Sequence, residues 1–144
     1  MKKILFLLSV TALLFVSCES QNDMYKFVKT YTIHSDQWEL EGGRDQLNSF
    51  YQAEIRIPEL NRDIYEDGNV FCYMYQIVDG VKVQTLLPFN LPLGQGNPNG
   101  SEHLWTETYA YDFTIGSIML YVNRSDFYTN NRPPTTSFRV VLNH

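Results

Sequence analysis

The residues best suited to recognise a ligand lie close together between positions 105 and 111. Trp105, Tyr109 and Tyr111 occupy alternate positions, and Glu107 lies between them in the same register. Alternate residues of a strand share one face, so an exposed strip of these rings beside a carboxylate would stack on sugar rings and hydrogen-bond their hydroxyl groups. The same spacing is typical of core aromatics or of rings that cover a sheet edge. Two aromatic residues in or near predicted loops are weaker candidates: Trp38 and Tyr128.

Patterns that bind metals do not occur in this sequence. Its histidines share no ligand spacing, and we expect each of them to be structural or solvated: His34, His103 and His144. An acidic cluster, Asp63, Glu66 and Asp67, precedes Gly68. A calcium loop needs oxygen ligands at alternating positions and a late bidentate glutamate, and the spacing here differs. We therefore predict a capped, solvated turn in place of a metal site, and no cofactor.

Known catalytic motifs are missing as well. The sequence has no Gly-x-Ser-x-Gly elbow and no phosphate-binding glycine loop. Cys72 lies inside an apolar run, residues 70–75, without a nearby histidine or acid, which indicates a buried cysteine acting as a small hydrophobic residue. Glycosidases need two carboxyl groups on opposite sides of a cleft, and a sequence does not place such a pair. We predict no catalytic residues and keep a small hydrolase as a remote alternative.

Short strands dominate the elements that would position these residues. The chain holds ten Tyr, nine Phe and two Trp, residue types that favour pleated sheets, and several stretches alternate with period two. The predicted strands are residues 25–33, 37–40, 49–57, 70–78, 81–87, 104–113, 117–123 and 137–142, with one helical turn at 60–66. The run 70–78 is apolar on both faces at its start, which predicts a central strand.

Turn residues divide these strands. Asp79-Gly80 predicts a tight hairpin, and Gly116 suits the left-handed position of a three-residue hairpin. Pro88 and Pro92 are expected to end the strand before them, since proline cannot donate to a ladder. Polar loops are predicted at residues 94–100 and 126–136. Seven or eight strands joined this way indicate an all-β, antiparallel two-sheet β-sandwich spanning residues 25–144, with a closed β-barrel as the alternative.

The N-terminus has the composition of an export signal. Lys2 and Lys3 precede an apolar run at residues 4–16, which is shorter than the roughly 20 residues that a membrane-spanning helix needs. Residues 14–18 resemble the lipobox of bacterial lipoproteins. That resemblance implies a diacylglyceryl group on the Cys18 thiol and cleavage before it, so that residues 1–17 are a signal peptide and 18–24 a polar tether. An ordinary signal peptide cut near Ser17 and an uncleaved anchor are the alternatives.

A lipid on Cys18 would hold the domain at a membrane without a spanning segment. Each buried methylene contributes about 0.8 kcal/mol, and two or more acyl chains hold firmly. The tether is acidic and polar at residues 19–23, and it resembles export signals that send lipoproteins of Bacteroides-type bacteria to the outer face of the outer membrane. We therefore expect a protein of the bacterial cell envelope, lipid-anchored to the outer membrane.

Charge excludes one class of partner. Two of the eleven basic residues, Lys2 and Lys3, belong to the signal, so nine basic residues face 16 acidic ones in the remainder, a net charge of about −7. No basic stripe is present, so nucleic acid is not expected as a partner.

Two thirds of the chain, from Tyr51 onward, resembles a family of uncharacterised lipoproteins of Bacteroides-type bacteria. The matching segments are residues 57–58 with the turn to 67–68, then 70–75, 86–89, 109–111, 116–118 and 138–141. The resemblance implies an all-β domain on a lipid anchor, and lipid binding has been suggested for some members. It carries no catalytic residues.

These observations together predict a cell-envelope lipoprotein whose β-domain binds a ligand or acts as a scaffold without catalysis. Two more specific alternatives remain open at this stage. One is a binder of a lipid or another apolar small molecule in an internal cavity. The other is a carbohydrate-binding accessory of a surface glycan-uptake system, using the residues around Trp105.

Overall fold

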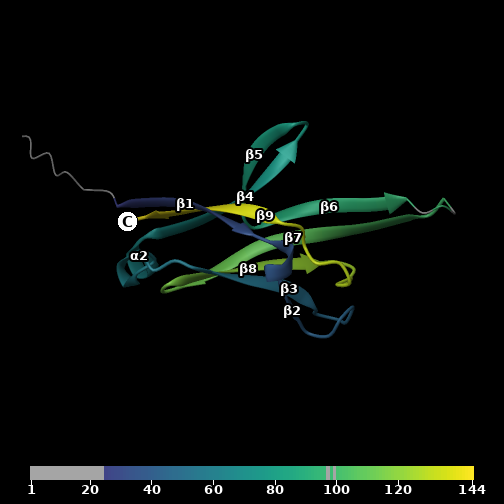
Figure 1. Cartoon of the computed structure of the whole chain (residues 1–144), viewed down its shortest axis with the longest axis horizontal. Helices are drawn as coiled ribbons and strands as arrows, with labels where there is room; N and C mark the ends of the chain where they lie inside the picture. The colour runs from purple at the N-terminus through teal and green to yellow at the C-terminus, as the bar shows by residue number, and fades with distance from the viewer. Residues whose placement is uncertain (1–24, 97, 99) are drawn as a thin grey trace, which may run out of the picture.

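The computed structural model describes residues 25–96, 98 and 100–144, and this part of the chain is an antiparallel β-sandwich (Figure 1). The two sheets hold four and five strands and do not close into a barrel, so the sandwich prediction is confirmed and the barrel alternative is wrong. The strands are β1 (Lys26–Ile33), β2 (Glu39–Glu41), β3 (Phe50–Arg56), β4 (Asn69–Val78), β5 (Val81–Leu86), β6 (Phe89–Gly96), β7 (Glu102–Thr114), β8 (Ser117–Arg124) and β9 (Thr136–Asn143). Two short helices accompany them: η2 (Ser35–Gln37) and α2 (Arg62–Asp67).

The strand order shows which elements are central. One sheet runs β1-β9-β4-β5 and the other β2-β3-β8-β7-β6, with every neighbouring pair antiparallel. Strand β4 lies between β9 and β5, which confirms the prediction that its apolar sequence belongs to a central strand. The chain crosses between the sheets several times, so the sandwich is stabilised mainly by contacts between residues far apart in sequence.

The core fills the space between the two sheets. Strand β8 contributes Ile118, Leu120 and Val122 at alternate positions, all at most 2% exposed. Trp38 is fully buried and meets the ring of Phe138 edge to face, with 6.2 Å between the centroids. Burial of such aromatic and aliphatic side chains supplies most of the driving force for folding.

Cys72 belongs to this core, as its apolar surroundings predicted. Its side chain is fully buried, and burial raises the pKa of the thiol to about 12. A thiol that stays protonated at neutral pH is a poor nucleophile. The structure therefore gives this cysteine a packing role.

Strand β5 ends just before Pro88, as predicted, but the boundary predicted at Pro92 is wrong, because a further strand, β6, includes Pro92. This strand is the outermost of its sheet, paired on one side with β7, and Pro92 lies opposite Thr106. An edge strand has a side that needs no hydrogen-bond donor, so a proline is tolerated there. The same strand extends through Gly96 and takes in the first part of the loop predicted at residues 94–100.

The predicted helical turn at residues 60–66 is confirmed as α2. Asn61 caps it, with its side-chain oxygen accepting a hydrogen bond from the Ile64 amide at 3.0 Å. Arg62 and Glu66 form an exposed ion pair one turn apart, at 3.0 Å. Within the described residues, no group of His, Cys, Asp or Glu side chains is arranged to hold a metal ion.

Candidate functional site

The candidate site lies where the five-stranded sheet extends past the sandwich core. In the register of this sheet, Tyr109 lies opposite Val122 inside the core, and two residues further Glu107 lies opposite Arg124. Beyond that point Trp105 lies opposite Leu93 on β6. Because alternate residues share a face, the same face is apolar in the core and polar toward this end of the hairpin.

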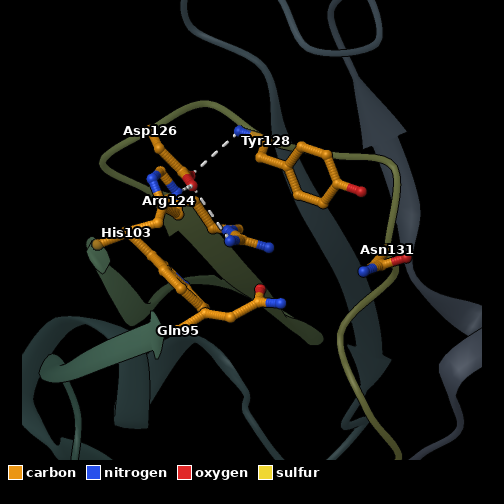
Figure 2. A pocket seen from close by; sticks show the side chains of 7 residues that line it. Gln95, His103, Arg124, Asp126, Tyr128 and Asn131 are labelled. Carbon is orange, nitrogen blue, oxygen red and sulfur yellow. Dashed lines mark hydrogen bonds and ion pairs between the residues drawn. The ribbon is translucent and has the colours of Figure 1, made fainter. Parts of the chain in front are cut away.

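The segment between β8 and β9 forms the opposite wall. Between this segment and the extended end of the sheet formed by β6, β7 and β8 lies an open cleft of about 250 Å³. Its lining residues are Gln95, His103, Trp105, Arg124, Asp126, Tyr128 and Asn131. Figure 2 shows His103 and Gln95 on one side of the cleft, Tyr128 and Asn131 on the other, and the Arg124 side chain extending between them.

Arg124 is the central residue of the cleft. Its guanidinium carbon lies 4.7 Å from the centroid of the Trp105 ring and 5.0 Å from that of Tyr128. Two aromatic faces therefore attract the same cation. The Arg124 side chain is only 12% exposed, so packing against these rings fixes its position.

A hydrogen-bond network joins Arg124 to the loop. Its Nη2 donates to Asp126 Oδ2 at 3.2 Å, and the same oxygen lies 2.8 Å from His103 Nε2 (Figure 2). The other carboxylate oxygen accepts from the Tyr128 amide at 3.2 Å. Burial raises the pKa of Asp126, but the hydrogen bonds from His103, Tyr128 and Arg124 outweigh burial and lower that pKa below its ordinary value of 3.8. Asp126 is thus held ionised as an acceptor.

The backbone of the loop is held by local hydrogen bonds. The Thr106 amide donates to Ser125 Oγ at 2.9 Å, and the Ser125 amide donates to the Thr106 carbonyl at 3.0 Å. Phe127 has a positive φ of 54°, and its amide donates to the Arg124 carbonyl at 3.1 Å. This tight turn places Asp126 and Tyr128 on the cleft side of the loop.

Glu107 lies next to this network. One of its oxygens accepts a hydrogen bond from the Tyr109 hydroxyl at 3.2 Å, and the other is 3.9 Å from Arg124 Nε. Its side chain is 16% exposed. Burial and the neighbouring Glu107 carboxylate raise the pKa of Tyr109, so this hydroxyl remains a donor. Glu107 therefore joins the polar end of the sheet to the core.

The structure divides the site residues predicted from sequence into some at the cleft and some in or against the core. The expectation that the odd positions of strand β7 share one face is confirmed, and Trp105 lines the cleft with Glu107 beside it. Tyr109 is a core residue at 3% exposed, and the Tyr111 hydroxyl donates to the Val70 carbonyl across the sandwich at 2.8 Å. Trp38 is fully buried. Trp38 and Tyr109 are therefore buried in the core, and Tyr111 is half-buried and packs against it, so none of the three lines the cleft.

Sequence reasoning missed most of the polar lining. Gln95, Arg124, Asp126 and Asn131 were not selected, because they reach the cleft only when β6, β8 and the following loop come together. His103, which we expected to be structural or solvated, is 53% exposed and its ring stacks on Trp105 with 5.3 Å between the centroids. One signal was available: extending the predicted strand by one residue places His103 in register with Trp105 and Glu107.

Comparisons with protein families, with curated proteins and with solved structures find no match for this chain. No helix in the described part of the chain is long and apolar enough to cross a membrane. Cys18, the signal peptide predicted at residues 1–17 and the tether at 18–24 lie outside the described residues.

Proposed function

We propose that this protein is a lipid-anchored protein of the bacterial cell envelope that binds a carbohydrate in the cleft around Arg124 without catalysing a reaction. The observation that carries the ligand proposal is the composition of the cleft. Two aromatic rings and five polar side chains, from two strands of one hairpin, one neighbouring strand and one loop, converge on a space open to solvent.

This lining suits a sugar. Sugars present apolar ring faces together with hydroxyl groups, so their binding sites combine aromatic rings with amides and carboxylates. Tyr128 is 38% exposed, and the exposed amides of Gln95 and Asn131 lie near it. A volume of about 250 Å³ is below the usual range for drug-sized ligands. It favours recognition of a single sugar unit, such as the end of a glycan chain.

The chemistry of Asp126 supports binding over hydrolysis. A glycosidase needs one carboxylic acid whose pKa is raised so that it can protonate the leaving group. Here the hydrogen bonds from His103 and Arg124 lower the pKa of Asp126. An ionised carboxylate fixed by three donors serves as a positioning group and an acceptor.

The rival proposal, an apolar ligand inside the sandwich, has less support. The side chains between the sheets are buried and in contact, including Trp38, Leu120 and Phe138, each at most 1% exposed. A lipid would need an unfilled apolar interior. The carbohydrate proposal rests instead on a cleft that is present.

A glycan array tests the ligand class. The full-length chain should bind a subset of the array, and Tyr128→Ala should reduce that binding about two- to tenfold, since stacking on an aromatic ring contributes about 0.5–1.5 kcal/mol. Tyr25→Ala is the matched control, because Tyr25 is similarly exposed, at 44% against 38%, and lies outside the cleft. Equal binding by both variants, or no glycan bound by the wild type, would contradict the proposal.

Metabolic labelling tests the anchor. Cells that express the wild-type chain should incorporate labelled palmitate into the protein and retain it in the membrane fraction. Cys18→Ala should abolish both, because the thiol that carries the lipid is gone. Unchanged membrane association of Cys18→Ala would show that the chain is held in another way.

A further inference from the structure

We infer that the cleft selects an acidic saccharide, and that Arg124 receives the sugar's carboxylate. This inference rests on the proposed function, since it specifies the class of carbohydrate bound at the same site. A neutral sugar would also stack on Tyr128, but it would have no carboxylate to pair with Arg124.

The first observation is that Arg124 uses few of its donors within the protein. A guanidinium carries five N–H donors. Among the described residues, the Arg124 guanidinium donates one hydrogen bond, from Nη2 to Asp126, and Nη1 donates none. Nε is buried 3.9 Å from Glu107 Oε1, so the donors that a ligand can reach are those of the two terminal nitrogens.

The carboxylate of Asp126 is occupied within the protein, so the acceptors left in the cleft are the neutral amide oxygens of Gln95 and Asn131. Asp126 Oδ2 receives Arg124 and lies against His103, and Oδ1 accepts from the Tyr128 amide. A sugar hydroxyl offers the Arg124 guanidinium one neutral oxygen, whereas a carboxylate offers two ionised oxygens in the spacing of the guanidinium donors. A carboxylate brings acceptors alone, which matches the donors that remain.

The second observation is the direction from which Arg124 is accessible. The rings of Trp105 and Tyr128 cover the guanidinium at 4.7 and 5.0 Å. In Figure 2 the end of the side chain reaches past Asp126 into the space between Tyr128 and Gln95. An acceptor must therefore approach the exposed edge of the guanidinium, which is the geometry of a two-point Arg–carboxylate pair.

Charge near the site does not prevent this contact. Asp126 is already neutralised in part by Arg124 and by the hydrogen bond to His103, and Glu107 lies behind Arg124, toward Tyr109. The groups at the open side of the cleft, Gln95 and Asn131, are neutral amides. Since the sequence as a whole is acidic, recognition depends on short-range hydrogen bonds and not on long-range attraction.

Calorimetry with matched sugars tests the inference on the wild-type full-length chain. The probes are glucuronic, galacturonic and mannuronic acids, their methyl esters, and the corresponding neutral hexoses. At least one free acid should bind tenfold or more tightly than both its ester and its hexose, since a charge-assisted pair contributes about 1.5–3 kcal/mol. Equal binding of acid, ester and hexose would overturn the inference and leave the proposed function intact. No binding by any probe, together with a blank glycan array, would overturn both.

Two variants of Arg124 locate the effect. Arg124→Lys keeps the charge but loses the planar fork, and Arg124→Gln loses both, so each should reduce the preference for the acid at least tenfold. Arg56→Gln is the control, because the Arg56 side chain is exposed and its position on β3 lies opposite Ser117, at the end of β8 away from the cleft. Circular dichroism checks that the variants fold. If they do not, the comparison of acid with ester on the wild type still decides the question.

Discussion

At the scale of single residues, the cleft shows how burial and hydrogen bonding together fix a charge. Arg124 and Asp126 have side chains that are 12% and 14% exposed. Charges this well buried are costly unless they are paired. Here aromatic rings, a backbone amide and His103 complete the pairing. The same contacts that make the pair tolerable also orient it toward the cleft.

The lowered pKa of Asp126 predicts a dependence of stability on pH. A carboxyl whose pKa is lower in the folded state stabilises the protein above its unfolded pKa, and this contribution disappears as the pH falls through the folded pKa. Asp126→Asn should therefore lower the free energy of unfolding by about 1–3 kcal/mol at pH 7. The difference from wild type should shrink well below pH 3.8. Urea titrations at pH 7 and at about pH 2.5 measure both values, and a constant difference would contradict the assignment.

At the scale of elements, hairpins position the site. Strands β7 and β8 extend beyond the core, and β6 pairs with β7 at the edge of the sheet. Residues from these three strands therefore meet at the end that carries the cleft. At the other end, Gly116 turns β7 into β8 with a φ of +87°. Its amide donates to the Leu60 carbonyl and its carbonyl accepts from the Ile57 amide, both at 2.8 Å. This hairpin is thus attached to the segment that leads into α2.

Gly116→Ala should destabilise the protein through its backbone. A side chain in the left-handed region costs about 1–2 kcal/mol, and an added Cβ meets no atom within 4 Å that would offset this cost. Gly96→Ala is the matched control, since Gly96 has equal space around it and no positive φ. Chemical denaturation should show the loss for Gly116→Ala and little change for the control. Equal stability of the two variants would mean that the turn relaxes.

At the scale of the whole molecule, stability comes from one continuous core between two sheets. The buried cluster includes residues from both sheets and from the segments between them. The cleft lies at the end of this core, so the polar network and the apolar packing occupy different parts of the same face. We therefore expect changes in the core to affect stability without changing which ligand is bound.

Leu120→Ala tests this separation. Leu120 is 1% exposed at the centre of β8, so the substitution should cost about 2–5 kcal/mol by leaving a cavity. Leu47→Ala is the control, because Leu47 is 76% exposed and should change stability by less than about 0.5 kcal/mol. The folded fraction of Leu120→Ala should retain the glycan preference of the wild type. Altered preference in that variant would show that the core and the cleft are coupled.

Much of the fold was predictable because its signals are local. Alternation and apolar runs predicted the strands other than β6, and Asp79-Gly80 and Gly116 predicted two hairpins that the structure contains. The loop at Gly116 has two residues and not the three predicted, because β7 extends to Thr114, which pairs with Ser117. Strand β6 was missed because proline normally ends a strand, and only its place at the sheet edge makes Pro92 acceptable. Whether a proline is tolerated depends on the neighbouring strand, which a local pattern does not contain.

By itself, the sequence determined the all-β class, the buried position of Cys72, the hairpin turns and the shared face of Trp105, Glu107 and Tyr109. These follow from period-two patterning and turn chemistry, which act over a few residues. Only the tertiary structure decided which part of that face is core and which is cleft. The reason is that the opposing sheet covers Tyr109 but stops short of Trp105, where Arg124 and the loop bearing Asp126 and Tyr128 meet it instead.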